Sequence, residues 1–216
     1  MHCHSAEMID LSQAALADSR QIASTLLSER LDLEKIFGRN APLQVDLGCG
    51  DGSFLYALAQ EMPAKNFLGV ERLAGRVSSS TCKAAKIDNV RILRAELAYT
   101  IRFLLPPESV ETFYLLFPDP WPKRRHRRRR VVSRDFLNAI RHALVPNGVL
   151  HVATDQRDYF EQIRERAMAT RDFAVVDLTD SPTQTVDLPR TTFETRYRAE
   201  GAPIHRLELR KISPVT

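Results

Sequence analysis

The segment FPDPWPKRRHRRRR, residues 117–130, joins a proline-rich acidic turn to a block of positive charge. Prolines at positions 118, 120 and 122 fix their own φ angles and bias Asp119 and Trp121, which precede prolines, toward extended backbone. Because this turn cannot become helix, it can hold the Asp119 carboxylate rigidly for catalysis or binding. Packing against neighbouring residues is the better explanation for Trp121.

The basic block from Lys123 to Arg130 is a local feature of the chain. It carries a formal charge of +7, whereas the whole chain carries +4, so the remainder is net negative at −3. Charges this close repel one another unless an anion lies among them, which favours nucleic-acid phosphates as the partner. We therefore predict phosphate contacts for Arg127, Arg128, Arg129 and Arg130. A solvated helix face or a nuclear address is the alternative, and His126 is better explained as a further backbone contact than as a base.

Three of the eight glycines of the chain, Gly48, Gly50 and Gly52, fall in the segment VDLGCGDG. Glycines allow a sharp turn and close approach of a ligand to the backbone. The dinucleotide fingerprint would need glycine at position 53, which is serine here, and Asp46 and Asp51 would repel a pyrophosphate. The cationic sulfonium and amino groups of S-adenosylmethionine suit this loop better. A dinucleotide and a purely structural turn remain the alternatives.

Further carboxylates stand at the ends of the apolar runs that follow. Ligands of doubly wound sheets bind beyond the carboxyl ends of the strands, so these acids should converge on one site. Glu71 is placed to accept hydrogen bonds from ribose hydroxyls, and Glu96 to contact the adenine edge. Asp155 follows the fifth run.

The elements that must position these residues are predicted from apolar patterning. Five nearly continuous apolar runs alternate with helical segments, which indicates a doubly wound, mostly parallel α/β sheet with helices on both faces. The runs cover residues 43–48, 66–71, 89–96, 109–118 and 148–155. Residues 204–212 alternate as expected of a late, antiparallel strand on the edge side. We predict helices over 12–37, a helical extension over residues 1–40, and one domain over 41–216.

Composition indicates a globular protein, and we expect no export signal because the segment MHCHSAEMIDLSQ has neither a basic start nor an apolar signal core. The chain has 216 residues, is 44% hydrophobic, and has no apolar run near the roughly 20 residues that span a bilayer. We expect a cytoplasmic protein with no membrane partner. Three scattered cysteines do not suggest disulfides. The spacing His2, Cys3, His4 resembles a metal motif, but a frayed terminus explains it better and we expect no metal.

Five segments in this order carry a family resemblance: VDLGCGDG, FLGVE, FPDPWPKRRHRRRR, ATD and TTFETR. Together they resemble the bacterial tRNA (guanine-N7-)-methyltransferase family over about residues 43–210. The resemblance implies a Rossmann-like class I methyltransferase fold that uses S-adenosylmethionine. It also implies methyl transfer to N7 of a guanosine in the variable loop of tRNA, and we expect a monomer or weak homodimer.

The resemblance also implies roles for individual residues. Asp119 matches the proposed catalytic position of the family and one of its cofactor-contacting acids. The other residues that match cofactor-contacting acids are Asp46, Glu71 and Glu96, and those that match tRNA contacts are Lys123, Asp155, Thr191, Thr192, Phe193 and Glu194. At two positions the side chain differs from that of the family by one methylene. This chain has Asp46 where glutamate is common in the family, and Glu96 where aspartate is common. Exact contacts at these two positions are therefore open.

Three other functions are compatible with parts of this pattern. An NAD-dependent oxidoreductase could use a similar sheet, although position 53 and Asp46 argue against it. A non-enzymatic RNA-binding protein could use the basic block alone, but it would not need the glycine loop or the strand-end acids. A methyltransferase acting on protein or on a small molecule would not need the basic block.

Overall fold

The protein is described by a computed structural model that covers residues 20–23, 29–178 and 188–212. Its strands form one mixed sheet in the order β1-β4-β3-β2-β5-β6-β8-β7. The strands are β1 (Gln21–Ala23), β2 (Leu43–Leu47), β3 (Asn66–Glu71), β4 (Val90–Arg94), β5 (Val110–Leu116), β6 (Leu144–Thr154), β7 (Phe173–Asp177) and β8 (His205–Lys211). Strands β1 to β6 pair in parallel, and β8 pairs antiparallel with both β6 and β7.

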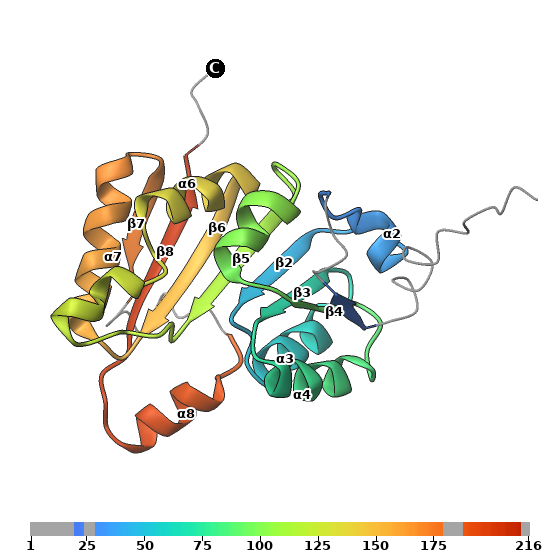
Figure 1. The fold of residues 1–216 in the computed structure, drawn as a ribbon, viewed down its shortest axis with the longest axis horizontal. Helices are drawn as coiled ribbons and strands as arrows, with labels where there is room; N and C mark the ends of the chain where they lie inside the picture. The colour runs from blue at the N-terminus through green and yellow to red at the C-terminus, as the bar shows by residue number, and fades with distance from the viewer. Residues whose placement is uncertain (1–19, 24–28, 179–187, 213–216) are drawn as a thin grey trace, which may run out of the picture.

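Helical segments connect these strands and cover the sheet (Figure 1). They are α2 (Leu33–Phe37), α3 (Ser53–Glu61), α4 (Ala74–Ala84), α5 (Leu97–Tyr99), the π-helix η2 (Thr100–Leu104), the 3₁₀-helix η3 (Arg124–Arg129), α6 (Arg134–Ala143), α7 (Arg157–Thr170) and α8 (Thr192–Ala199). Side-chain caps define several starts. For example, the Ser133 hydroxyl accepts a hydrogen bond from the Phe136 N–H at 3.1 Å at the start of α6.

Two hydrophobic clusters lie on opposite faces of the sheet. Successive strand residues point to opposite faces, so Phe67 packs with α3 and α4, while its neighbour Leu68 packs with η2, α6 and α7. The same alternation separates Ile92 from Leu93. Both faces are therefore buried, which explains the continuous apolar runs and confirms the predicted doubly wound sheet.

The predicted helix over residues 12–37 is wrong in its middle part. Residues 21–23 form β1, which pairs in parallel with β4, and the Ile92 N–H donates to the Arg20 carbonyl at 2.7 Å. Ile22 is fully buried there, so the edge of β4 supplies both hydrogen bonds and an apolar surface that a local helix would lack. Residues 12–19 and 24–28 lie outside the described part, and the boundary at residue 40 stays a prediction.

The last strand of the chain is antiparallel, as predicted, but it does not lie at the edge. Strand β8 runs between β6 and β7. The sequence interpretation missed β7, whose side chains are exposed or half-buried except Phe173. This edge strand buries only its first side chain, so its antiparallel pairing with β8 defines it.

Neither a membrane-spanning helix nor a metal-binding cluster occurs among the described residues. None of the helices in these ranges combines the length and apolar character needed to cross a membrane. Within the same ranges, no group of three or more His, Cys, Asp and Glu side chains is arranged to hold a metal ion. His2, Cys3 and His4 lie outside the described residues.

Candidate functional site

The parallel strands direct their carboxyl ends to the same edge of the sheet, and the predicted site residues follow these ends. Strand β2 lies between β3 and β5, and β5 lies between β2 and β6. Figure 1 shows α8 beyond this edge, facing the arrowheads of β5 and β6. The topology therefore places the glycine loop, the proline-rich acidic turn of residues 117–122 (the elbow) and the end of β6 at neighbouring strand ends.

The glycine loop after β2 has the backbone that its sequence requires. Gly48, Gly50 and Gly52 have φ values of 88°, 57° and 77°, a region that side-chain-bearing residues rarely adopt. The N–H groups of Gly48 and Cys49 donate to the Val70 carbonyl at 2.9 and 3.1 Å, which joins the loop to the end of β3.

The glycines of this loop have different neighbours. A Cβ added at Gly48 would meet no atom within 4 Å, so the space before it is open to a ligand. A Cβ at Gly52 would lie 2.8 Å from Cβ of Ser80 in α4. Gly52 thus allows α3 and α4 to pack closely, in addition to the turn that it makes.

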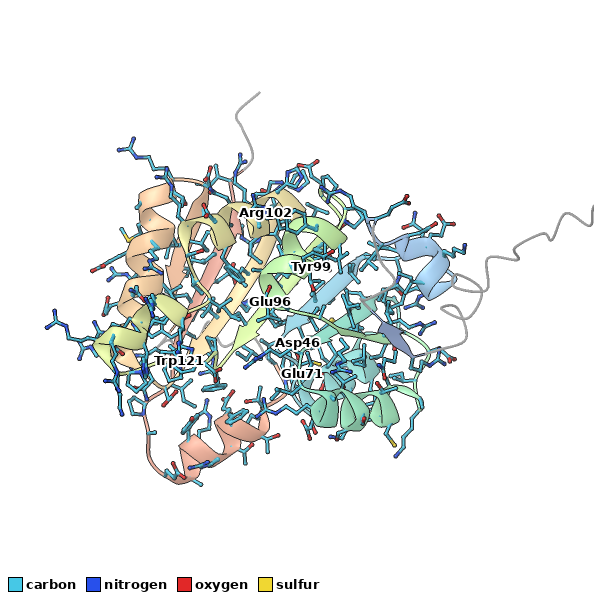
Figure 2. The ribbon with its side chains drawn as sticks, in the orientation of Figure 1. Asp46, Glu71, Glu96, Tyr99, Arg102 and Trp121 are labelled. Atoms are coloured by element: carbon cyan, nitrogen blue, oxygen red, sulfur yellow. The ribbon has the colours of Figure 1, made fainter. Side chains whose placement is uncertain are left out.

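Asp46 and Glu71 form a buried acidic pair beside the glycine loop (Figure 2). Asp46 is only 4% exposed and Glu71 only 5%. Burial, and then the negative charge of Glu71, raise the pKa of Asp46 from 3.8 to about 7. A cationic group bound at this pair would offset the cost of the buried charges, so the chemistry of the pair suits an ammonium or sulfonium ligand.

Backbone groups fix the orientation of the Glu71 carboxylate. Its Oε1 accepts hydrogen bonds from the N–H groups of Arg72 and Leu73 at 2.8 and 2.9 Å. Its Oε2 lies 3.9 Å from Nη1 of Arg76. The carboxylate is thus held at the end of β3, with Oε2 in a loose ion pair that a hydroxyl donor could replace.

In the structure, Asp51 is paired with Lys83, so its charge would not repel a pyrophosphate as the sequence interpretation assumed. Lys83 Nζ lies 2.6 Å from Asp51 Oδ2, and the Ser53 hydroxyl donates to the same oxygen at 2.7 Å. Burial alone would raise the pKa of Asp51, but hydrogen bonds from Lys83 and Ser53 lower it. Because Lys83 neutralises this charge, Asp46, in the strand before the loop, is the acid that opposes an anionic ligand.

Glu96 has a structural task that the sequence interpretation did not include. It is the N-cap of α5, where its Oε2 accepts a hydrogen bond from the Tyr99 N–H at 2.8 Å. The residue is exposed and follows β4 in the chain, where Figure 2 labels it. Its contact with an adenine edge stays a prediction, because the cap occupies one of its two carboxylate oxygens.

The proline-rich elbow after β5 begins and ends with unusual backbone. Phe117 has φ 52° and Trp121 has φ 42°, so the prediction of extended backbone at Trp121 is wrong. The surroundings of its side chain explain this, since Arg129 lies over the indole at 4.9 Å and His126 meets it edge-on at 5.8 Å. Between the two strained residues, Asp119 is exposed at the end of β5.

The basic block forms η3, and its side chains fall into two groups. Lys123, Arg128 and Arg129 are exposed, and Arg127 is 43% exposed with Nη2 at 2.9 Å from Asp158 Oδ2. In contrast, the Arg130 side chain is 0% exposed. The predicted phosphate contact of Arg130 stays a prediction, because its guanidinium would have to leave this enclosed position to make it.

Aromatic contacts bring α8 to the elbow. The Phe117 ring lies 5.5 Å from the Tyr197 ring and 6.4 Å from that of Phe193. Burial, and then the charge of Asp155, raise the pKa of Tyr197, which places α8 near the end of β6 as well. The structure thus gathers the ends of β5 and β6 with α8, which carries most of the TTFE segment.

Two residues of the TTFE segment are engaged within the protein. The Thr191 hydroxyl caps α8 by accepting a hydrogen bond from the Glu194 N–H at 3.0 Å. Glu194 is 7% exposed, and its Oε1 lies 2.8 Å from Arg198 Nε and 2.6 Å from Arg206 Nη2. Arg206 belongs to β8, so Glu194 fastens α8 to the sheet. Thr192 and Phe193 are exposed.

An open pocket elsewhere contains none of the predicted site residues. It is lined by Glu29, Arg30, Tyr99, Arg102 and Phe103. Figure 2 shows Tyr99 and Arg102 on the helix after β4, above Asp46 and Glu71. The Arg102 guanidinium lies over the Phe103 ring at 5.3 Å. These contacts give the pocket an aromatic wall, which the sequence interpretation did not anticipate.

Known proteins resemble this chain in sequence and in fold. The family model described as a putative methyltransferase matches residues 40–207. A tRNA (guanine-N(7)-)-methyltransferase of Halorhodospira halophila is 37% identical over 185 residues, which cover 82% of this chain and 78% of that relative. The enzyme of the same name from Psychromonas ingrahamii is 34% identical, with 85% of this chain and 76% of the relative covered.

Solved structures agree on the fold. The 16S rRNA methyltransferase KamB matches with a TM-score of 0.62 at 19% identity, over 89% of this chain and 99% of that chain. A SAM-dependent O-methyltransferase of Thermotoga maritima matches with a TM-score of 0.56 at 13% identity, over 82% of this chain and 62% of that one. The fold is therefore that of the class I methyltransferases. Together with the sequence matches, this shows that the chain belongs to the tRNA (guanine-N(7)-)-methyltransferase family.

Proposed function

We propose that this protein transfers a methyl group from S-adenosylmethionine to N7 of a guanosine in the variable loop of tRNA. One observation carries the proposal: the buried pair Asp46 and Glu71 lies beside the open backbone of Gly48. Such a pair favours a cationic nucleoside ligand over an anionic dinucleotide. The exposed side chains of the basic block, which forms η3 after the elbow, support a polyanionic substrate. The named relatives support tRNA as that substrate.

The residues at the ends of β2 and β3 fit this cofactor. When bound, S-adenosylmethionine supplies an electrophilic methyl group on a positively charged sulfur. Asp46 would face its cationic groups, Gly48 and Gly50 would allow close approach of the backbone, and Glu71 Oε2 would accept from the ribose. Because the pKa of Asp46 is raised to about 7, part of this carboxyl group is protonated near neutral pH. A bound cation would favour its ionised form.

Guanine N7 carries a lone pair and no proton, so no side chain needs to act as a base on it. The remaining tasks are to hold the base in line for attack and to stabilise the positive charge that the ring acquires. Asp119 is suited to both, since its carboxylate can accept from guanine N1–H and the exocyclic amine. Asp155, at the end of the neighbouring strand β6, is its proposed partner.

The RNA must present an unstacked guanine, which a loop provides more readily than a duplex. Lys123, Arg127, Arg128 and Arg129 are exposed next to the elbow and are the proposed phosphate contacts. Thr192 and Phe193 of α8 are exposed near the same strand ends and would meet the RNA from the other side. Glu194 and Thr191 would support α8 instead of reaching the base directly.

A direct assay tests this function. The protein is incubated with methyl-labelled S-adenosylmethionine and bulk tRNA, and the digested nucleosides are identified by mass spectrometry. We expect 7-methylguanosine as the labelled product. A tRNA with 7-deazaguanosine in the variable loop is the matched control, because it lacks the acceptor nitrogen. Label in another nucleoside, or equal labelling of the deaza control, would contradict the proposal.

Replacement of Glu71 by alanine should weaken cofactor binding. The variant loses charge-assisted hydrogen bonds to the ribose, each worth roughly 1.5–3 kcal/mol, so we expect Kd to rise about 10- to 100-fold. Calorimetric titration with S-adenosylmethionine measures the change. Glu61→Ala, at the exposed end of α3, is the control and should bind normally. Unchanged affinity in Glu71→Ala would refute the ribose assignment.

Replacement of Arg127, Arg128 and Arg129 by glutamine should weaken tRNA binding and reduce its salt dependence. Each lost phosphate contact reduces the magnitude of the negative slope of log K against log salt by about 0.7–0.9, so the loss of three should reduce it by roughly 2 to 3. Binding is measured by fluorescence anisotropy over a salt series. The control variant replaces three partly exposed arginines outside the basic block by glutamine: Arg141, Arg164 and Arg210. It removes the same charge and should leave the slope unchanged.

A further inference from the structure

Arg130 is the one residue of the basic block whose side chain is enclosed by protein in the described structure. Its Nε donates to the Pro120 carbonyl at 2.7 Å, and its Nη1 donates to Gln162 Oε1 at 3.1 Å. Its Nη2 lies 2.7 Å from Asp158 Oδ2, and its guanidinium lies over the Tyr159 ring at 4.6 Å. Three of its nitrogens thus have partners within the chain.

The partners of Arg130 connect two separate elements. Pro120 follows Asp119 in the elbow, whereas Asp158, Tyr159 and Gln162 all belong to α7. Helix α7 itself is anchored in the core, since Tyr159 is 0% exposed. Arg130 therefore links the elbow to α7 at the carbonyl of Pro120, the residue that follows Asp119.

The elbow needs such an anchor because its backbone is strained. Phe117 and Trp121 both have positive φ and both precede a proline, so the chain would relax to other conformations without external contacts. The Phe117 end is held by a hydrogen bond from its N–H to the Ala153 carbonyl at 2.7 Å. The Trp121 end has the stacked Arg129 and the Arg130 bond to Pro120.

We infer that Arg130 is a positioning residue for methyl transfer, which acts by fixing the elbow that carries Asp119. This inference rests on the proposed function for its kinetic consequence, although the contacts exist in the protein alone. A phosphate contact would require the guanidinium to leave its bonds to Pro120, Gln162 and Asp158. The neighbouring Arg128 and Arg129 offer the same charge to RNA without that loss.

Asp158 gives this anchor a connection to the RNA-facing residues. Its Oδ2 is shared by Arg130 at 2.7 Å and Arg127 at 2.9 Å. A phosphate that draws Arg127 away would leave Asp158 to Arg130 alone. RNA docking would thereby strengthen the anchor of the elbow at the moment when Asp119 is needed.

Trp121 provides a readout that does not depend on activity. It is the single tryptophan of the chain and lies next to Pro120 in the elbow. In Arg130→Lys the charge is kept, but an ammonium cannot reach Pro120, Gln162 and Asp158 together. We expect the emission of Trp121 to shift and its quenching by acrylamide to rise. Arg164→Lys, an exposed arginine of α7, should leave both unchanged.

Kinetic measurements separate positioning from phosphate binding. Arg130→Lys should lower kcat about 10- to 100-fold at saturating tRNA, because a misplacement of the order of 1 Å at the reacting centre has such an effect. The affinity for tRNA and the slope of its salt dependence should stay as in the wild type. Arg128→Gln, in contrast, should change binding: the Kd for tRNA should rise, and the salt dependence of binding should become weaker.

Asp158→Asn provides an independent test with opposite expectations. If Arg130 positions the elbow, this variant should also lower kcat and change Trp121 emission. If Arg130 contacts phosphate, removal of the carboxylate should strengthen RNA binding without lowering kcat or moving Trp121, and this result would overturn the inference. A lowered salt slope in Arg130→Lys with normal Trp121 emission would overturn it as well.

Two checks keep these outcomes distinguishable. Far-UV circular dichroism and thermal unfolding show whether each variant folds; if Arg130→Lys does not, Asp158→Asn and Gln162→Met remove single bonds of the same anchor and decide the question. If the wild-type protein does not methylate tRNA, the proposed function fails. The Trp121 comparison still decides whether Arg130 holds the elbow.

Discussion

Replacement of Asp119 by alanine is expected to lower kcat roughly 100-fold or more, because the variant loses a carboxylate placed to stabilise charge that develops in the transition state. Asp119 is exposed at the end of β5, next to the strand that leads into the glycine loop. Its loss should change the affinity for S-adenosylmethionine much less than the rate. Single-turnover methyl transfer at saturating tRNA and cofactor measures the first quantity, and calorimetry measures the second.

Two further variants define the role of this carboxylate. Asp119→Asn keeps the shape of the side chain but replaces the charged carboxylate by a neutral amide. If Asp119 stabilises the positive charge on the purine, the kcat of this variant should be nearly as low as that of Asp119→Ala. Asp88→Ala removes a carboxylate that is 100% exposed and far along the chain in the turn before β4, and it should turn over normally. Near-normal turnover of Asp119→Ala would remove Asp119 from the mechanism.

The core of the fold could be predicted from sequence because the central strands are buried on both faces. Strands β2 to β6 coincide with the five apolar runs to within a few residues, since burial on both faces leaves a continuous signal. Strands β1 and β7 were missed because they lie at the two edges of the sheet. An edge strand depends on its partner for its hydrogen bonds, and that partner is distant in sequence.

Helix α8 was also missed, although the sequence contains a signal for its start. Thr191 and Glu194 have the spacing of a capping box, and the Thr191 hydroxyl does cap the Glu194 N–H. The Glu194 side chain, however, turns to Arg198 and Arg206. Local spacing thus holds a signal for the helix start that the sequence interpretation did not use, while the burial of Glu194 depends on β8 and could not be derived from local sequence.

The candidate site shows the same division. Acids at strand ends converge because parallel strands share one carboxyl edge, so Asp46 and Glu71 could be paired from the topology alone. Arg130 could not be separated from Arg127, Arg128 and Arg129, because all four are arginines in one run. Only the position of Asp158 and Gln162 on α7 distinguishes the enclosed residue from the exposed ones.

Asp46 shows that the site and the stability of the fold make opposite demands. Burial raises its pKa from 3.8 to about 7, so between these values the folded state binds a proton that the unfolded state has released. The unfolding free energy therefore falls as pH rises from about 4 to 7. The carboxylate is retained at this cost in stability, which is expected where a cationic ligand must be held.

Replacement of Asp46 by asparagine should consequently stabilise the protein and impair it at once. Above pH 7 we expect an unfolding free energy higher by on the order of 4 kcal/mol, because the variant buries no charge at this position. The difference should vanish below about pH 4, where the wild-type carboxyl is protonated in both states. Urea unfolding over a pH series measures this dependence. A difference that does not change with pH would contradict it.

Cofactor binding should change in the opposite direction in the same variant. Loss of the carboxylate that faces a cationic group should raise Kd for S-adenosylmethionine roughly 10- to 100-fold. Wild-type binding near pH 6.5 should also release a proton, because the ligand favours the ionised form of Asp46. Calorimetry in buffers of different ionisation enthalpy detects this proton, and Asp46→Asn should not release it. Equal proton release by both proteins would show that another group, and not Asp46, meets the cation.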